Sequence, residues 1–218
     1  MITRPGMALF LLAASGSTLS LARADTLVTE GLVAWETCAE CHSLDGISAM
    51  ARFPKLAGQR PQYIVKQVRD FRDGRRQNDA GQMTATASDT SDEALAKSAA
   101  YFASLLPPPP DASLATDTDT WRRGADLYEN GDPASGIAKC SACHDGAQAE
   151  RPDVPLLKAQ HAAYLVKELR DWRSGERQND PSQAMPAIAA KLSDDDISAL
   201  ATFLASQPRL RSNGNTAQ

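Results

Sequence analysis

Two short stretches decide the expected fold: Cys38-Ala39-Glu40-Cys41-His42 and Cys140-Ser141-Ala142-Cys143-His144. The Cys-x-x-Cys-His pattern is typical of covalent haem attachment, in which two thiols form thioethers with the haem vinyl groups and the adjoining His ligates the iron. All 4 cysteines of the sequence lie in these two motifs. We therefore expect two covalently bound haem c groups, held through Cys38 and Cys41 and through Cys140 and Cys143, with His42 and His144 as iron ligands.

A methionine follows each motif at the same distance. Met83 lies 41 positions after His42, and Met185 lies 41 positions after His144. A thioether opposite the His closes both faces of the iron and raises its potential, which is typical of electron-transfer haems. A lone Met more often fills a core, so the matched spacing is what favours Met83 and Met185 as sixth ligands.

The chain also repeats itself. The segment 63–79 aligns with 164–180 at an offset of 101, and 11 of the 17 positions are identical. Cysteine and methionine positions repeat at an offset of 102. The repeat predicts an all-α protein made of two tandem copies of one haem module. The expected divisions are a signal peptide over residues 1–24, a first module over 25–106, a linker over 107–120 and a second module over 121–218.

The linker and the helices follow from local patterns. Pro107–Pro110 cannot continue a helix and favours an extended spacer. Amphipathic periodicity predicts helices over 63–73 and 164–174 that stop at Gly74 and Gly175. Opening helices are expected over 27–35 and 121–128. Final helices are expected to begin near Ser91 and Ser193, with capping boxes over 90–93 and 193–196.

The N-terminus has the pattern of an exported protein. Arg4 precedes a short apolar run over residues 7–14, and Ala22-Arg23-Ala24 fits a cleavage site. The apolar run is shorter than the roughly 20 residues that span a bilayer, although a retained anchor remains an alternative. We therefore expect a periplasmic protein after cleavage near Ala24.

Charge excludes one class of partner. The formal net charge is −4, and removal of Arg4 and Arg23 with the signal would make it −4 − 2 = −6. The charge is shared between the modules and provides no basic surface of the kind that binds nucleic acid. No nucleic-acid partner is expected.

The alternatives for the cysteine motifs are weaker. A structural zinc site needs four ligands, whereas each motif offers three that lie close together. A thioredoxin-like motif needs a strand followed by a helix, and the sequence predicts helices throughout.

Four further residues are candidates for contacts around the haem. The carbonyl groups of Pro54 and Pro155 can accept the Nδ1–H of the axial His and orient its ring, although each proline can equally mark a plain turn. Tyr63 and Tyr164 can donate to haem propionates. The same role is open to the arginines of the repeat: Arg69, Arg72, Arg76, Arg170, Arg173 and Arg177. For those arginines a solvated helix face is an equally good interpretation, and His161 is expected at the solvated surface.

Each half resembles a class I cytochrome c, and the exported tandem resembles the dihaem cytochrome c4 family. The resemblance covers nearly all of residues 25–207. It rests on both haem motifs, the segments 53–59 and 63–73, and the run from Met185 to Asp194. It implies that Met185, and Met83 by register, are axial ligands. It also implies modules related by a pseudo-twofold axis, with haem propionate edges facing across their interface.

The sequence departs from the family pattern at two places. Thr90 stands where the second half has Leu192, and the segment 156–160 lacks the Gly that the first half has at position 58. These departures concern the packing of loops.

The expected function is that of a periplasmic dihaem shuttle. It would carry single electrons from a dehydrogenase or quinol-oxidising complex to a terminal oxidase or reductase, and any association with the membrane would come through such a partner. The first alternative is a dihaem subunit of a dehydrogenase, for example in sulfur-compound oxidation. The second is a dihaem enzyme such as a peroxidase or thiosulfate dehydrogenase. An enzyme needs an open or labile axial position, whereas both methionines are in place, so we expect no catalytic residues.

Overall fold

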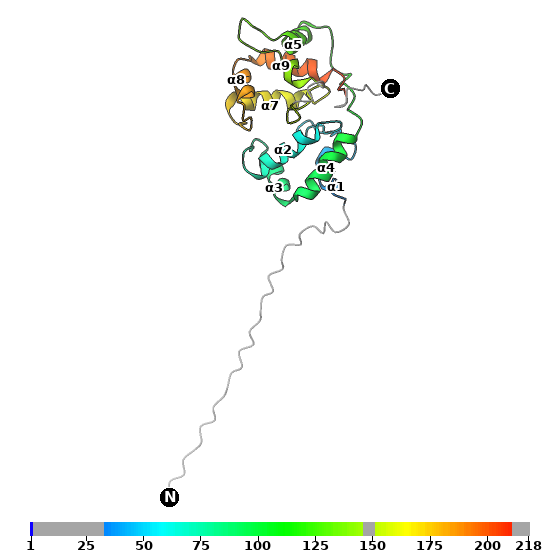
Figure 1. The fold of residues 1–218 in the computed structure, drawn as a ribbon, viewed down its shortest axis with the longest axis vertical. Helices are drawn as coiled ribbons and strands as arrows, with labels where there is room; N and C mark the ends of the chain where they lie inside the picture. The colour runs from blue at the N-terminus through cyan, green and yellow to red at the C-terminus, as the bar shows by residue number, and fades with distance from the viewer. Residues whose placement is uncertain (2–32, 146–150, 211–218) are drawn as a thin grey trace. The chain divides into compact units, whose positions relative to one another are not determined.

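The computed structural model describes Met1, residues 33–145 and residues 151–210. Within these residues the regular secondary structure is helical, with isolated bridges at Arg76–Arg177 and Asp132–Ile137. The helices are α1 (Glu36–His42), α2 (Pro61–Arg72), α3 (Gln82–Asp89), α4 (Asp92–Ser104), α5 (Asp119–Asn130), α6 (Ser141–His144), α7 (Ala162–Ser174), α8 (Ala184–Ala189) and α9 (Asp194–Ala205). In Figure 1, α1–α4 group together and α5–α9 group together, with α2 and α7 lying along the border between the groups. We call the described residues up to 106 the first half and those from 121 the second half.

The two helices of the internal repeat form as expected. Pro61 occupies the first turn of α2, where its missing N–H leaves no hydrogen bond unmade. Gly74 follows α2 with φ +69°, and Gly175 ends α7 with φ +82°. Glycine adopts this left-handed conformation without steric cost. The two glycines are equivalent in the repeat, and the helices before them end within one residue of each other.

One of the two expected capping boxes is confirmed and the other is wrong. Ser193 accepts the N–H of Asp196, and the Asp196 carboxylate accepts the N–H of Ser193. In the first half Ser91, rather than Thr90, caps α4 and accepts the N–H of Ala94. The residue three positions after Ser91 is an alanine, which cannot return the second bond.

Helices α3 and α8 were not expected, although they contain Met83 and Met185. Both are short, and their sequences carry little amphipathic pattern. Each follows a residue with positive φ, Gly81 at +83° and Gln183 at +56°. A left-handed residue redirects the chain at this point in both halves, and no periodicity marks such a turn.

Each half has its own hydrophobic core. In the first half Ile64, Ala99 and Phe102 are buried, and Trp35 stacks on Tyr101 with ring centroids 4.4 Å apart. The larger core of the second half joins α5, α7 and α9, and its buried members include Leu127, Tyr128 and Ile197.

Close packing of α5 on α9 depends on a glycine. A Cβ at Gly124 would collide with the carbonyl group of Ala199. The missing side chain therefore lets the two helix backbones approach each other.

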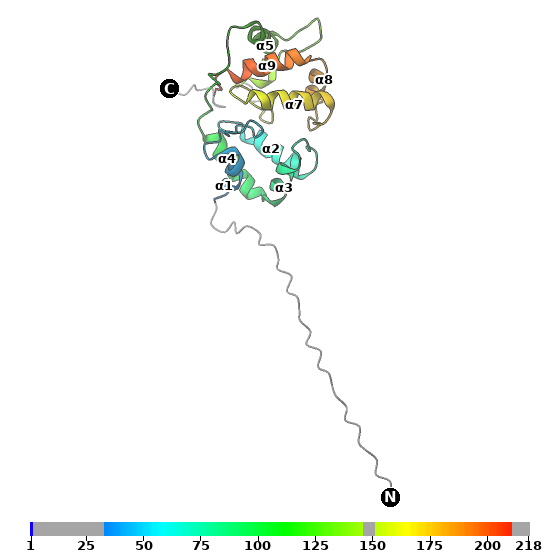
Figure 2. The same ribbon diagram turned by 180° about the vertical axis from the view of Figure 1, so that it is seen from behind.

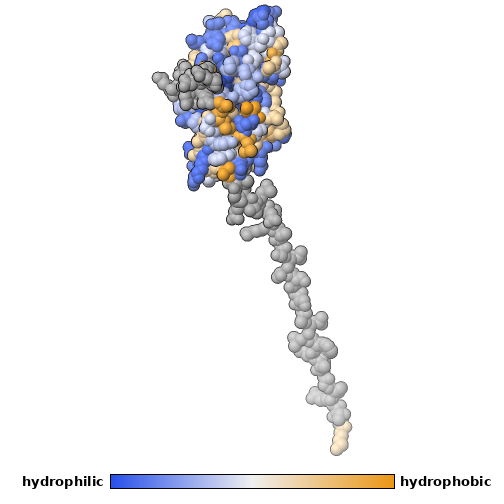
Figure 3. Space-filling view, turned by 90° about the vertical axis from the view of Figure 1, so that its right-hand side faces the viewer, coloured by the Kyte–Doolittle hydropathy of each residue, from blue (hydrophilic) through white to orange (hydrophobic). Residues whose placement is uncertain are grey.

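Figure 2 shows α5 and α9 beside each other at the end of the body that lies away from α3. On the face in Figure 3, apolar surface gathers in the middle and lower part of the body, among hydrophilic residues.

Of the residues that the structure describes, none belongs to a helix long and apolar enough to cross a membrane. The expected signal peptide beyond Met1 and most of the expected helix over 27–35 lie outside the described residues.

Candidate haem sites and the contacts between them

The first Cys-x-x-Cys-His motif lies on one face of a helix. Cys38, Cys41 and His42 belong to α1, and residues three and four apart are neighbours on a helix surface. In the second half Cys140 is the N-terminal flanking residue of α6, which contains Cys143 and His144. The same one-sided arrangement therefore arises in both halves.

Both histidine rings are buried and oriented by a proline carbonyl group. His42 Nδ1 lies 2.8 Å from the oxygen of Pro54, and His144 Nδ1 lies 2.9 Å from the oxygen of Pro155. A ring that donates through Nδ1 presents a free Nε2, the atom that a metal would take. Burial lowers the pKa of both rings, to about 4 for His144, so each ring is neutral near pH 7 and available as a ligand.

The four thiols are free. Burial raises the pKa of Cys38, and it raises the pKa of Cys140 to about 11, so both thiols are protonated at neutral pH. Within the described residues no group of three or more His, Cys, Asp or Glu side chains is arranged to hold a metal ion. Two free thiols beside a neutral imidazole fit a haem, because the porphyrin supplies four of the iron ligands itself.

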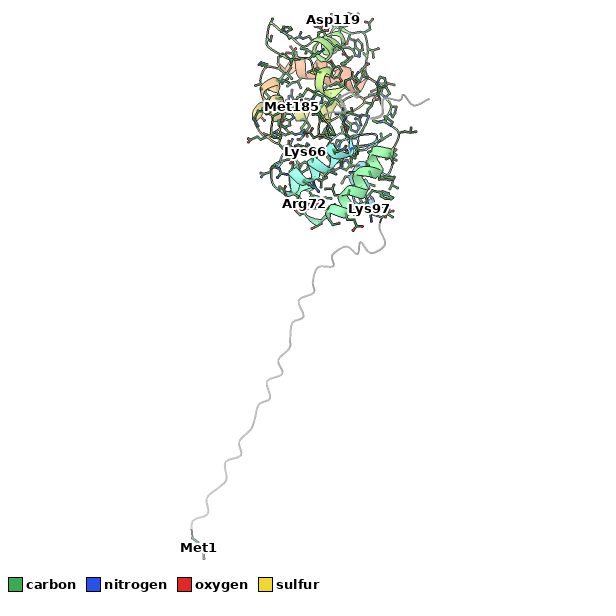
Figure 4. All side chains as sticks on the ribbon, in the orientation of Figure 1. Met1, Lys66, Arg72, Lys97, Asp119 and Met185 are labelled. Atoms are coloured by element: carbon green, nitrogen blue, oxygen red, sulfur yellow. The ribbon has the colours of Figure 1, made fainter. Side chains whose placement is uncertain are left out.

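Met83 and Met185 lie near the starts of α3 and α8 and are half-buried. The backbone N–H of Met185 donates to the carboxylate of Asp180 over 2.8 Å. In the first half Asp79 accepts instead from Thr84, one residue after the methionine. Figure 4 labels Met185 within the second half and Lys66 at the border with the first half.

Tyr63 and Tyr164 reach across the border between the halves. The Tyr164 hydroxyl lies 3.1 Å from an Arg76 guanidinium nitrogen, and the Tyr63 hydroxyl lies 3.5 Å from one of Arg177. Each tyrosine therefore contacts an arginine of the other half. The sequence predicted these tyrosines near the haem but did not predict their contacts with arginines of the other half.

A closed ring of four buried side chains joins the halves. Arg76 donates to Gln67 over 2.8 Å and to Glu168 over 2.8 Å. Arg177 donates to Glu168 over 2.7 Å and to Gln67 over 3.0 Å. All four residues are between 5% and 8% exposed. The ring carries two cations and one anion, because Gln67 occupies the position that Glu168 has in the second half.

The sequence did not predict this ring. It offered the arginines either contacts to haem propionates or a solvated helix face. The only signal of the ring was the repeated Arg-Gln-Asn-Asp at 76–79 and 177–180. Other arginines of the repeat have local roles. Arg72 donates to the carbonyl of Thr90 over 2.6 Å and to Asp92 over 2.7 Å, which holds α2 against the start of α4.

His161 differs from its expected place at the solvated surface. It is half-buried, and its Nε2 lies 2.9 Å from the Ser48 oxygen of the first half. Burial lowers its pKa. Sequence alone could not show that the loop of the other half covers it.

Helical modules with a buried, carbonyl-oriented His beside two free thiols define a c-type cytochrome. Residues 119–204, which include nearly all of the second half, match the family described as cytochrome c oxidase, cbb3-type, subunit III. The chain is 40% identical to a cytochrome c4 of Thiocapsa roseopersicina over 77% of this chain and 85% of that protein. It is 38% identical to a thiosulfate dehydrogenase electron acceptor of Stutzerimonas stutzeri over 77% of each chain.

A solved structure agrees with these relatives. The crystal structure of reduced recombinant cytochrome c4 from Pseudomonas stutzeri superposes with a TM-score of 0.66 at 34% identity, covering 78% of this chain and 93% of that one. The chain belongs to the cytochrome c4 family. It is an all-α electron-transfer protein that carries two c-type haems, as its two cysteine motifs predicted.

Proposed function

We propose that this protein is a freely diffusing periplasmic carrier of single electrons. Its donor would be a dehydrogenase or quinol-oxidising complex, and its acceptor a terminal oxidase or reductase. The observation that carries the proposal is the pairing in each half of a buried His, held through Nδ1, with a methionine at matched spacing. The N-terminal signal pattern supports the periplasmic location.

In the proposed sites each haem is attached through the two cysteines of its motif, Cys38 and Cys41 or Cys140 and Cys143. His42 and Met83 would ligate the iron in the first half, and His144 and Met185 would ligate it in the second. Haem iron held between imidazole and thioether exchanges one electron with little change in ligation.

The chain's own residues keep these ligands in place. Pro54 and Pro155 orient the imidazoles by accepting their Nδ1–H, which also raises the basicity of the ligating nitrogen. Both rings are buried, which would limit access of water to an iron bound at Nε2. Two closed sites favour a carrier over an enzyme, because a substrate would find no free position.

Ligand exclusion tests this proposal. The reduced protein should not bind carbon monoxide near neutral pH, and alone it should turn over neither peroxide nor thiosulfate. Met185→Ala opens one site and should then bind one carbon monoxide for each protein. Stoichiometric binding by the unaltered protein would contradict the carrier assignment and favour an enzyme.

A second candidate is a fixed electron-accepting subunit of a thiosulfate dehydrogenase. It is favoured by the 38% identity to a protein named as such an acceptor, close to the 40% identity to a cytochrome c4. Co-purification from native cells separates the two. A constant stoichiometric partner supports the subunit, whereas the free protein supports the carrier.

A further inference from the structure

The loops that follow the two oriented prolines lie against each other across the border between the halves. In the first half this loop is 54–59, and in the second it is 155–160. Each begins with the proline whose carbonyl meets the histidine and ends with a buried glutamine, Gln59 at 3% exposure and Gln160 at 5%. We call these segments the proline loops.

Each glutamine is hydrogen-bonded to the proline loop of the other half. Gln160 accepts the N–H of Lys55 over 2.9 Å and donates to its carbonyl oxygen over 3.0 Å. Gln59 accepts the N–H of Leu156 over 2.9 Å and donates to its carbonyl oxygen over 3.0 Å. The amide oxygen and the amide nitrogen of each glutamine are therefore both bonded to one residue of the opposite half, and the oxygen also accepts the N–H of the next residue in its own chain segment, Arg60 or His161.

The residues that are clamped in this way adjoin the histidine contacts. Lys55 directly follows Pro54, the partner of His42, and Leu156 directly follows Pro155, the partner of His144. A bidentate clamp on one residue restricts rotation of the peptide plane before it, and that plane contains the proline carbonyl group.

The residue after each glutamine adds a second contact across the border. Arg60 donates to the carbonyl groups of Asp145, Arg151 and Val154 over 2.7 to 3.0 Å. These three residues belong to the segment between His144 and Pro155. His161 makes the equivalent contact to Ser48, in the segment between His42 and Pro54.

The backbone of the two loops has the same shape despite a change of residue. Gly58 and Ala159 have φ of +66° and +58°, although alanine, unlike glycine, adopts this conformation at a steric cost. Ala159 is fully buried. The second loop therefore keeps the shape that points its glutamine across the border.

From these contacts we infer that each axial histidine is positioned by the opposite half of the protein. Gln160 positions His42 through Lys55 and Pro54, and Gln59 positions His144 through Leu156 and Pro155. Both glutamines are positioning residues, since they are hydrogen-bonded to the residues that follow Pro54 and Pro155 and not to His42 or His144. The inference rests on the proposed ligation of iron by His42 and His144.

Proton exchange at His42 and His144 tests whether each histidine is positioned by the opposite half. In the ferrous holoprotein, the Nδ1–H of each ligated imidazole can be followed by NMR during transfer to D₂O. Gln160→Ala should speed exchange of the His42 proton by about ten-fold, as expected for loss of buried hydrogen bonds, and change the His144 proton by less than two-fold. Gln59→Ala should show the reverse.

Two further sets of variants keep the test decisive. Gln178 is exposed and donates to Gly175 within its own half, so Gln178→Ala should leave both protons unchanged. If an alanine variant does not fold, Gln160→Glu and Gln59→Glu keep the side-chain shape but place a carboxylate oxygen against the backbone carbonyl group. Gln160→Glu should speed exchange of the His42 proton, and Gln59→Glu should speed exchange of the His144 proton.

The outcomes separate this inference from the proposed ligation. Upfield-shifted imidazole signals in the unaltered ferrous protein establish that His42 and His144 bind iron, whatever the glutamines do. Faster exchange at the histidine of the same half, equal effects on both histidines, or no effect on either would overturn the crossed positioning. An effect confined to the opposite histidine in both variants supports it.

Discussion

At the scale of single residues, the two haem sites are built by near-identical contacts from different loops. His42 and His144 contact proline oxygens at 2.8 and 2.9 Å, although the segments between each histidine and its proline share little sequence. The constraint comes from the imidazole, which needs an Nδ1–H acceptor if Nε2 is to be presented to iron. The sites should therefore differ mainly on the methionine side.

A ligand change in the second half should affect one site alone. Met185→His should lower one of the two reduction potentials by roughly 0.2 V, within the range of about 0.8 V that axial ligands span, because imidazole favours ferric iron more than thioether does. Potentiometric titration with optical detection measures it. Met50 is exposed, and Met50→His, the control, should leave both potentials unchanged. An unchanged titration of the Met185 variant would show that this residue is not a ligand.

At the scale of secondary-structure elements, caps and close contacts decide where the helices end and how they cross. The box formed by Ser193 and Asp196 uses two backbone N–H groups at the start of α9, while Ser91 caps α4 through a single contact. The residue type at the third helical position makes this difference. Repeated elements therefore have unequal local stability.

Removing each cap should show that inequality. Ser193→Ala should lower the free energy of unfolding by about 1 to 2 kcal/mol, and Ser91→Ala by about 1 kcal/mol or less, as is typical of caps. Urea denaturation of the holoprotein measures both. A larger loss for Ser91→Ala would contradict the assignment of the caps.

The crossing of α5 and α9 gives a test in which two effects have opposite signs. Helix propensity alone would make Gly124→Ala stabilising by about 1 kcal/mol. Because the added Cβ meets the Ala199 carbonyl group, we expect a net loss of about 2 kcal/mol, typical of overpacking. Thermal unfolding measures the change, and a gain in stability would show that the helices separate without cost.

At the scale of the whole described body, the ring of Arg76, Gln67, Arg177 and Glu168 links the halves. Buried ion pairs contribute little net stability, but removal of one partner leaves an unpaired buried charge at a cost of about 3 to 5 kcal/mol. Burial alone would raise the pKa of Glu168. The two arginines outweigh burial and lower its pKa to about 2.

The ring should make stability depend on pH. The folded-state pKa of Glu168 is depressed, so its contribution is present above the unfolded value of about 4.3 and is lost as the pH falls towards 2. Glu168→Gln should lower the free energy of unfolding by about 3 kcal/mol at pH 7, and this deficit should shrink between pH 4.5 and 2. Denaturant titrations over this range measure it.

The matched control lies at the equivalent position of the other half. Gln67→Glu supplies a second carboxylate for the second guanidinium and should not reduce stability at pH 7. A deficit of Glu168→Gln that stayed constant with pH would contradict the assigned ionisation of Glu168.

The sequence by itself determined the haem motifs, the two-fold repeat and the helices α2 and α7. These depend on local spacing: two thiols and an imidazole within five positions, and an apolar period of one helical turn closed by glycine. Local patterning also identified the box at Ser193. It did not identify α3 and α8, whose start depends on left-handed residues that have no periodic signature.

Only the tertiary structure decided what the repeated polar residues do. Gln59 and Gln160 lie 101 positions apart, and each one is hydrogen-bonded to a loop that no local pattern connects with it. The sequence offered Arg76 and Arg177 either a haem propionate or a solvated helix face, where arginine is most often found. They are buried because each half supplies an acceptor for the arginine of the other half, Glu168 for Arg76 and Gln67 for Arg177, and such pairing exists only once the two halves have met.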